Sequence, residues 1–187
     1  MEQLLEHLQH FYHLSEEARE ALPGYFTRVE LPKNEYLITR GRVCNQLYFL
    51  EKGCLRGYYN LEDKEITYWF GFENDFVTSF HSFITRQPAV ENIQTVEGCV
   101  LWAITKDQLN ALFNEHHEVE RLVRIAYEKY YIRLEERFVN AQFRTAAERY
   151  QQLLEDAPHI LERMPLGHVA AYLGISQETL SRIRSKK

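Results

Sequence analysis

Cysteine is scarce in this sequence, and its spacing excludes several kinds of site. The chain has 187 residues and three cysteines, at Cys44, Cys54 and Cys99. They are too widely separated for the paired spacing that structural zinc sites use. We therefore expect buried free thiols, no metal site and no bound cofactor.

The sequence also lacks a long apolar run. No stretch reaches the roughly 20 residues that a membrane-spanning helix needs. The N-terminal segment Met1-Glu-Gln-Leu-Leu-Glu-His7 has neither the basic start nor the apolar core of a signal peptide. These absences predict a cytoplasmic protein without a membrane partner. A nucleophile elbow, a phosphate loop and a metal triad are missing too, so we expect no enzyme and no catalytic residue.

Positive charge is scarce in most of the chain and gathers at one end. The net charge is −5 at pH 7. Residues 163–187 contain five basic side chains and one acidic one, a charge of +4, which leaves −9 for the first 162 residues. A basic end on an acidic body indicates that one region meets phosphate while the rest avoids it.

Secondary-structure signals change along the chain. Residues 1–27 are predicted to be helical, because leucines recur there at helical spacing. Short strands separated by turn signals follow, which is typical of an antiparallel sandwich or barrel. The predicted strands are Thr27–Leu31, Tyr36–Thr39, Gln46–Glu51, Cys54–Tyr59, Glu65–Phe72 and Asn92–Ile104.

Helical signals return from Lys106 to about Asn140, and a second helix is predicted over Thr145–Glu155. In the first of these, apolar residues recur at spacings of four, three and four, a near-heptad stripe that favours packing against a second copy of the chain. The alternative is packing against the chain's own barrel. The stripe consists of Val119, Val123, Ala126 and Tyr130, with Leu134 and Phe138 continuing it.

The last stretch, Pro165–Arg184, predicts a helix-turn-helix. Gly174 stands at the sharp bend, where a positive φ is expected, and small Ala170 suits two helices that meet at a steep angle. Ser176 is placed to cap the second helix. That helix directs Gln177, Glu178, Ser181 and Arg182 outward, and such side chains can read base edges in a major groove. The alternative is an ordinary helical hairpin with a solvated face.

With these features the chain resembles the Crp/Fnr superfamily of bacterial transcription regulators. The most specific likeness is Leu173-Gly-Ile-Ser-Gln-Glu-Thr-Leu-Ser-Arg182. In the predicted barrel the likeness rests on Leu37-Ile-Thr-Arg-Gly41, Leu47-Tyr-Phe-Leu-Glu-Lys-Gly53, Leu55-Arg-Gly57 and Asn74-Asp-Phe76.

The resemblance implies an α+β fold with three parts. The first is an N-terminal antiparallel β-barrel or jelly roll of the cyclic-nucleotide-binding type, residues 1–115, which acts as sensor. A long dimerisation helix, residues 116–140, follows. A C-terminal all-α helix-turn-helix domain, residues 141–187, would bind DNA without an extended wing.

The resemblance also implies residue roles at the DNA. Gln177, Glu178 and Arg182 would read bases, and their chemistry agrees, because they suit adenine, cytosine and guanine respectively. Ser176 and Thr179 would contact phosphate. We expect further phosphate contacts from Ser181, Arg184, Lys186 and Lys187.

The effector site departs from the family pattern. Members that bind cyclic AMP hold its phosphate with a Gly-Glu pair and an Arg-Ser or Arg-Thr pair. Alignment places Thr78-Ser79 at the first pair and Ala89-Val90 at the second, with Arg86 nearby as a substitute cation. Burying the cyclic phosphate without its partners would cost several kcal/mol. We expect these five residues to serve an unknown small-molecule effector, or none, rather than cyclic AMP.

The sequence thus predicts a homodimeric, sequence-specific transcription regulator. Its expected partners are double-stranded DNA with a near-palindromic operator, a second copy of the chain and a small-molecule effector, with RNA polymerase as a further candidate. The alternative function is a small-molecule-binding signalling module whose helical tail contacts a protein rather than DNA.

Overall fold

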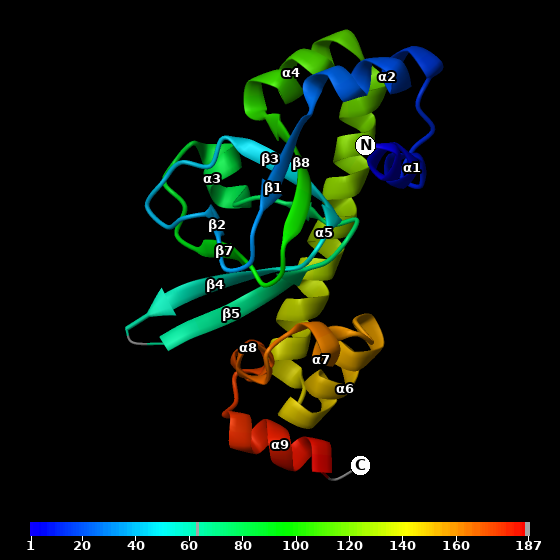
Figure 1. Cartoon of the computed structure of the whole chain (residues 1–187). Coiled ribbons are helices and arrows are strands. Elements are labelled where there is room, and N and C mark those ends of the chain that lie inside the picture. The colour runs from blue at the N-terminus through cyan, green and yellow to red at the C-terminus, as the bar shows by residue number, and fades with distance from the viewer. Residues whose placement is uncertain (63, 186–187) are drawn as a thin grey trace.

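A computed structural model describes residues 1–62 and 64–185 of the chain. A β-barrel lies beside a long helix, and small helices follow at the far end of that helix (Figure 1). Among the described residues, none of the helices combines the length and the hydropathy of a bilayer span. The helices are α1 (Glu2–Gln9), α2 (Glu16–Ala21), the 3₁₀ turn η1 (Leu22–Tyr25), α3 (Phe80–Thr85), α4 (Lys106–Glu115), α5 (His117–Phe143), α6 (Ala146–Asp156), α7 (Ile160–Arg163), α8 (Leu166–Leu173) and α9 (Gln177–Ser185).

Two four-stranded antiparallel sheets form the barrel, which confirms the predicted fold class. Their strand orders are β1-β8-β3-β6 and β2-β7-β4-β5. The strand predicted over Asn92–Ile104 is in fact two strands that belong to different sheets, because the chain turns at Glu97-Gly98. The strands are β1 (Thr27–Leu31), β2 (Tyr36–Ile38), β3 (Gln46–Lys52), β4 (Leu55–Leu61), β5 (Lys64–Gly71), β6 (Phe76–Val77), β7 (Asn92–Thr95) and β8 (Cys99–Thr105).

The helix predicted from Lys106 to Asn140 is broken. Thr105 caps α4 through a reciprocal capping box with Gln108, and α4 ends before His116. His116 has φ −134° and ψ 87°, which is not helical, and α5 begins directly after it. The break lets α4 cover the end of the barrel while α5 runs along its side (Figure 1).

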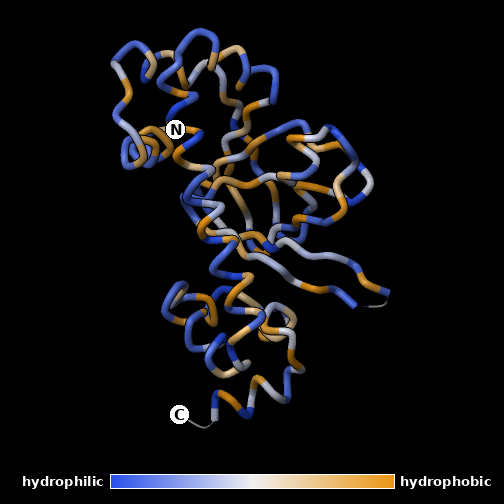
Figure 2. The backbone as a smooth tube through the Cα atoms, turned by 180° about the vertical axis from the view of Figure 1, so that it is seen from behind, coloured by the Kyte–Doolittle hydropathy of each residue, from blue (hydrophilic) through white to orange (hydrophobic). Residues whose placement is uncertain are grey.

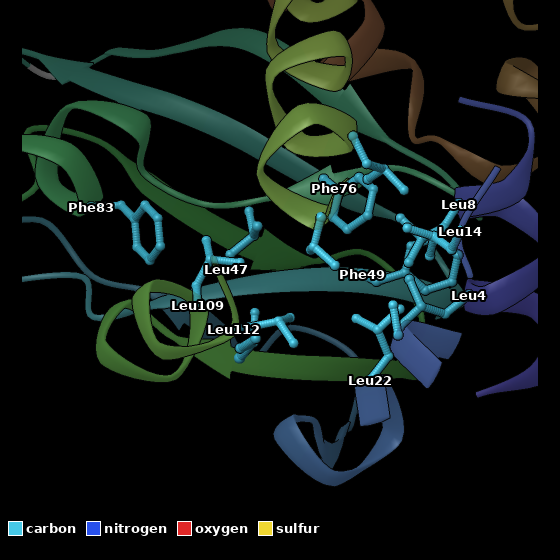
Figure 3. Close-up of a cluster of buried hydrophobic side chains, with 14 residues drawn as sticks. Leu4, Leu8, Leu14, Leu22, Leu47, Phe49, Phe76, Phe83, Leu109 and Leu112 are labelled. Atoms are coloured by element: carbon cyan, nitrogen blue, oxygen red, sulfur yellow. The ribbon is translucent and has the colours of Figure 1, made fainter. Parts of the chain in front are cut away.

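The first half of α5 is buried against the chain's own barrel. Val119 and Leu122 belong to the same core cluster as Phe49 and Phe76, part of which Figure 3 shows, and Ala126 is buried as well. The hydroxyl of Tyr130 accepts a hydrogen bond from the Phe76 amide at 2.7 Å and donates one to the Phe76 carbonyl at 3.1 Å.

The predicted dimer stripe therefore needs correction. Val119 and Ala126 are buried, and Val123 and Tyr130 are half-buried against the same cluster. A period of 3.6 residues shows that a helix has an apolar side, but the core of this chain already occupies that side. The alternative of packing onto the barrel is the correct one for these four residues.

The second half of α5 has an apolar side that nothing in the described chain covers. Tyr131, Leu134 and Phe138, called here the exposed stripe, are 66%, 58% and 65% exposed. Their spacings of three and four residues place them on one side of the helix. Figure 2 shows hydrophobic and hydrophilic segments alternating along this helix.

The C-terminal helices pack against the lower edge of the barrel. Cys54, Phe70 and Val96 of the barrel share a buried cluster with Val169, Leu173 and other residues of α6 to α9. The rings of Phe70 on β5 and Tyr172 on α8 have centroids 5.1 Å apart. Apolar burial therefore holds the two parts of the chain together.

An ion-pair network, called here the Arg163 clasp, reinforces that contact. From α7, the Arg163 guanidinium donates to Glu73 at 2.7 and 2.8 Å and to Glu97 at 2.7 and 3.1 Å. Glu73 also accepts from the Gly53 amide at 2.9 Å, and Glu97 accepts from the Cys54 thiol at 3.0 Å. One guanidinium thus joins two barrel turns to the helical end.

The clasp shifts the pKa values of its carboxylates. Hydrogen bonds from Arg163 are the main cause that holds the pKa of Glu97 below its usual value. For Glu73, burial alone would raise the pKa, but hydrogen bonds from Arg163 and from backbone amides outweigh it, and the pKa is lowered. Both carboxyl pKa values are lower in the folded protein than the ordinary value of 4.5. The clasp therefore stabilises the folded state at pH values above 4.5, and this stabilisation is lost as the pH falls through the lowered pKa values.

We predict that Arg163→Met lowers the free energy of unfolding at pH 7 by about 1–3 kcal/mol. This loss lies between those typical of breaking an exposed ion pair and of breaking a buried one. The matched control Arg28→Met breaks the exposed pair with Glu30 and should cost less than about 1 kcal/mol. Urea unfolding at pH 7 and at pH 4 measures both. The Arg163 effect should shrink at pH 4, and equal losses for the two variants would contradict the clasp.

Candidate DNA interface and effector site

The turn between α8 and α9 has the geometry of a tight helix-turn-helix. Gly174 has φ +66°, as predicted, because the chain reverses there in the left-handed region. The Ile175 amide then donates to the Ala170 carbonyl at 3.0 Å, which closes the end of α8. Ala170 is buried, so its small side chain lets the two helices approach.

Buried apolar residues fix α9 against its neighbours. Leu180 is fully buried together with Val169 and Leu173 of α8, and Ile183 packs beside them. This inner row leaves the opposite side of α9 in solvent. Figure 1 places α9 at the end of the molecule that is farthest from the barrel.

Two of the three predicted base-reading residues, Glu178 and Arg182, lie on the free side of α9. Gln177, Glu178 and Arg182 are all exposed, and Ser181 and Arg184 are exposed beside them. The amide of Gln177 rests on α8, because a Cβ added to Gly167 would lie 2.7 Å from its Nε2. Gln177 must therefore swing away from Gly167 to reach a base. Lys186 and Lys187 lie outside the described residues.

The predicted phosphate contacts at the start of α9 also organise the helix. The Ser176 hydroxyl accepts a hydrogen bond from the Thr179 amide at 3.2 Å, which is the predicted cap. Thr179 is half-buried, and its hydroxyl lies 3.2 Å from that of Ser176. A hydrogen bond from Ser176 is the main cause that lowers the pKa of Glu178, so its carboxylate is an acceptor at neutral pH.

The predicted effector residues do not share one accessible surface. Thr78, Ser79 and Ala89 are buried, whereas Val90 is 51% exposed. The Thr78 hydroxyl donates to the Gln46 carbonyl at 2.9 Å, so the fold itself uses it. Sequence alignment gives the position of these residues along the chain but not their direction, and the prediction of a common pocket needs correction.

Arg86 is likewise engaged with the fold. It ends α3 in the left-handed conformation, with φ 65°. Its guanidinium donates to the Cys44 carbonyl at 3.4 Å and to the Asn45 side chain. In this conformation its hydrogen bonds join the end of α3 to the loop before β3.

Sequence reasoning missed the carboxylate of Glu91. This residue follows Val90 and is only 4% exposed, and its Oε2 accepts from the Val90 amide at 3.1 Å. After burial, the nearby Glu91 charge is the next cause that raises the pKa of both Tyr59 and Tyr68. A buried carboxylate therefore lies beside the position where cyclic-AMP-binding members place an arginine. The sequence did contain a signal for this carboxylate, because Glu91 directly follows the aligned pair Ala89-Val90.

The Tyr68 side chain lies near Glu91, whose charge helps to raise the Tyr68 pKa. A Cβ added to Gly57 on β4 would lie 2.8–2.9 Å from the Tyr68 ring, so the ring lies directly on this glycine. The Tyr59 ring packs against it at a tilt of 42°, with ring centroids 4.8 Å apart. The structure thus brings together an aromatic pair and a carboxylate. Among the described residues, no group of histidine, cysteine and carboxylate side chains could hold a metal ion.

Comparison with known proteins gives a domain and a fold. Residues 28–116 match the family described as the cyclic nucleotide-binding domain. A comparison with curated protein sequences gives no match.

Solved structures match over most of the chain. FixK2 from Bradyrhizobium japonicum is 17% identical with a TM-score of 0.70, covering 86% of this chain and 83% of that one. A CooA mutant from Carboxydothermus hydrogenoformans is 18% identical with a TM-score of 0.66, covering 98% and 83%. The Thermus thermophilus catabolite activator protein is 19% identical with a TM-score of 0.61, covering 96% and 85%. Residues 28–116 therefore match the cyclic nucleotide-binding domain, and the fold of the chain as a whole is similar to that of these three solved structures.

Proposed function

We propose that the protein is a sequence-specific, DNA-binding transcription regulator. The observation that carries this proposal is the exposed side of α9, where Glu178 and Arg182 stand free on a helix fixed from behind by Leu180. An exposed helix with such side chains is the element that enters a major groove in helix-turn-helix proteins. The charge of +4 over residues 163–187 supports contact with phosphate at the same end.

Two such helices, related by a two-fold axis, would read a near-palindromic operator whose half-sites lie about one helical turn apart. Selection of duplexes from a random DNA pool tests this directly. An enriched palindrome supports the proposal. Binding without sequence preference, in the presence and absence of metabolite extract, would favour the alternative of a helical tail that contacts a protein.

We predict that Arg182→Ala relaxes base preference at one position of each half-site, costing about 1–3 kcal/mol on the preferred sequence. Arg184→Ala is the matched control, because Arg184 is exposed on the same helix and should contact phosphate. It should weaken all sequences alike and lower the salt dependence of binding. Fluorescence anisotropy on operator and scrambled duplexes measures both. An Arg182 effect that is equal on every duplex would remove this residue from the base-reading set.

The proposed dimer uses the exposed stripe of α5. Tyr131, Leu134 and Phe138 recur at coiled-coil spacing on a helix that continues to Phe143. We assign residues 1–115 to sensing, the long helix from residue 116 to dimerisation and the helices after it to DNA binding. In this arrangement the barrel can bias the spacing of the two recognition helices.

Phe138→Glu should convert the dimer to a monomer at micromolar concentration, because a charge would be placed in the apolar seam. Phe143→Glu is the matched control, since Phe143 is 81% exposed on the same helix but lies about 140° away around its axis. Analytical ultracentrifugation measures the oligomeric state. A monomeric wild-type protein that keeps full operator affinity, or a Phe138→Glu variant that remains dimeric, would contradict this dimer.

We also propose that cyclic AMP is not the effector. Ala89 and Val90 stand where cyclic-AMP-binding members carry the arginine pair, and Glu91 adds a buried negative charge next to them. A cyclic phosphate would meet repulsion instead of a counter-charge.

Millimolar cyclic AMP should accordingly leave the melting temperature and the operator affinity unchanged, relative to a 5′-AMP control. Since a ligand that binds the native state stabilises it in proportion to its saturation, differential scanning fluorimetry detects binding directly. A saturable rise in melting temperature with cyclic AMP alone would refute this part of the proposal.

A further inference from the structure

A cavity of 830 Å³ lies where the barrel, α5 and the C-terminal helices meet. Its walls come from β5, from the second half of α5 and from α6, α7 and α8. This volume is in the range of small-molecule sites, and sites at domain boundaries are common. The cavity is separate from the region around Thr78 and Ala89 where the cyclic nucleotide was sought, because none of those residues lines it.

Part of the cavity lining is aromatic and apolar, and charged and amide side chains form the rest. Trp69 and Phe70 of β5 line one wall, and Tyr172 of α8 lines another. Leu153 of α6 and Ile160 of α7, both buried, close the far side. Flat apolar rings are the natural occupants of such a space, since they can stack on these faces.

One charged side chain lies inside. Of the charged residues that line the cavity, only Arg137 is not exposed. Its guanidinium is 5.9 Å from the Tyr172 ring centroid and 6.0 Å from that of Tyr68, and across residues 1–62 and 64–185 no carboxylate pairs with it. The neighbouring Asn140 carboxamide has no hydrogen-bond partner in that same part of the chain. A guanidinium and an amide without partners are suited to one carboxylate.

The exposed rim limits the charge of the occupant. It contains Glu135, Glu136 and Asp156 as well as Arg133 and Arg144, and Arg133 is already paired with Asp75 at 3.1 Å. The rim is therefore net negative by one charge. A polyphosphate or a dicarboxylate would meet these acids, whereas a single negative charge held at Arg137 would not.

We propose that this cavity is a binding site for an aromatic monocarboxylate, with the carboxylate on Arg137 and Asn140 and the ring against the aromatic part of the lining, which includes Trp69 and Tyr172. A ligand there would touch the barrel, α5 and the helix-turn-helix at once, so its binding would couple the two ends of the chain. The proposed dimer leaves the cavity open, because Arg133, Arg137 and Asn140 face a side of α5 that lies roughly 120° from the exposed stripe.

Isothermal titration calorimetry of the full-length protein with 1-naphthylacetate tests the site, and 1-naphthylacetamide serves as the uncharged control ligand. The carboxylate should bind at least about tenfold more tightly than the amide, because only the carboxylate gains the charge-assisted bonds. Binding should also quench the fluorescence of Trp69, and Trp69→Phe should remove that quenching. Equal affinities for the two ligands, or no saturable binding at millimolar concentration, would overturn the proposal.

Two arginine variants locate the carboxylate. Arg137→Met should weaken 1-naphthylacetate about tenfold or more and leave 1-naphthylacetamide unchanged, which also shows that the variant is folded. Arg144→Met, on the rim of the same helix end, should change neither affinity by more than about twofold. An unchanged carboxylate affinity in Arg137→Met would refute the assignment. None of these measurements uses DNA, so their outcome is independent of the proposed DNA-binding function.

Discussion

One guanidinium fixes the orientation of the contact that apolar burial makes between the barrel and the C-terminal helices. Arg163 joins Glu73 and Glu97, which are 90 and 66 residues away in the chain, and both carboxylates are tied to the barrel backbone or to Cys54. Apolar burial around Phe70 and Tyr172 holds the two parts together, but the hydrophobic effect does not depend on their relative orientation. The bidentate pairs of the Arg163 clasp fix this orientation, because their geometry is satisfied in only one arrangement.

The long helix α5 meets a different environment on each of its sides. Its first half contributes Val119 and Leu122 to the barrel core. In its second half, Arg137 and Asn140 face the cavity, while Tyr131, Leu134 and Phe138 face away from the chain. The barrel, the cavity and the proposed dimer seam therefore all lie along one helix.

Much of the architecture could be predicted because its causes are local. Alternation of apolar residues revealed the strands, and a 3.6-residue period revealed the helices. Gly174, Ser176 and Leu180 identified the helix-turn-helix because a left-handed bend, a cap and an inner row each require particular residues. The division of Asn92–Ile104 between two sheets was missed although Glu97-Gly98, inside that range, is a turn signal. The break at His116 was missed because neither a proline nor a glycine marks it.

The candidate site residues divide in the same way. The exposed side of α9 follows from the spacing of Leu180 and Ile183, which the sequence shows directly. The partner of an apolar stripe does not follow from spacing, because Val119 and Val123 could pack equally well on a barrel or on a second copy. The sequence by itself thus determined most of the helices and strands and which side of α9 is polar. Only the tertiary structure decided that α5 packs on its own barrel, that Arg163 pairs with Glu73 and Glu97, and that Arg137 lies in a cavity. Contacts between distant residues arise from the folding of the whole chain, and no local pattern encodes them.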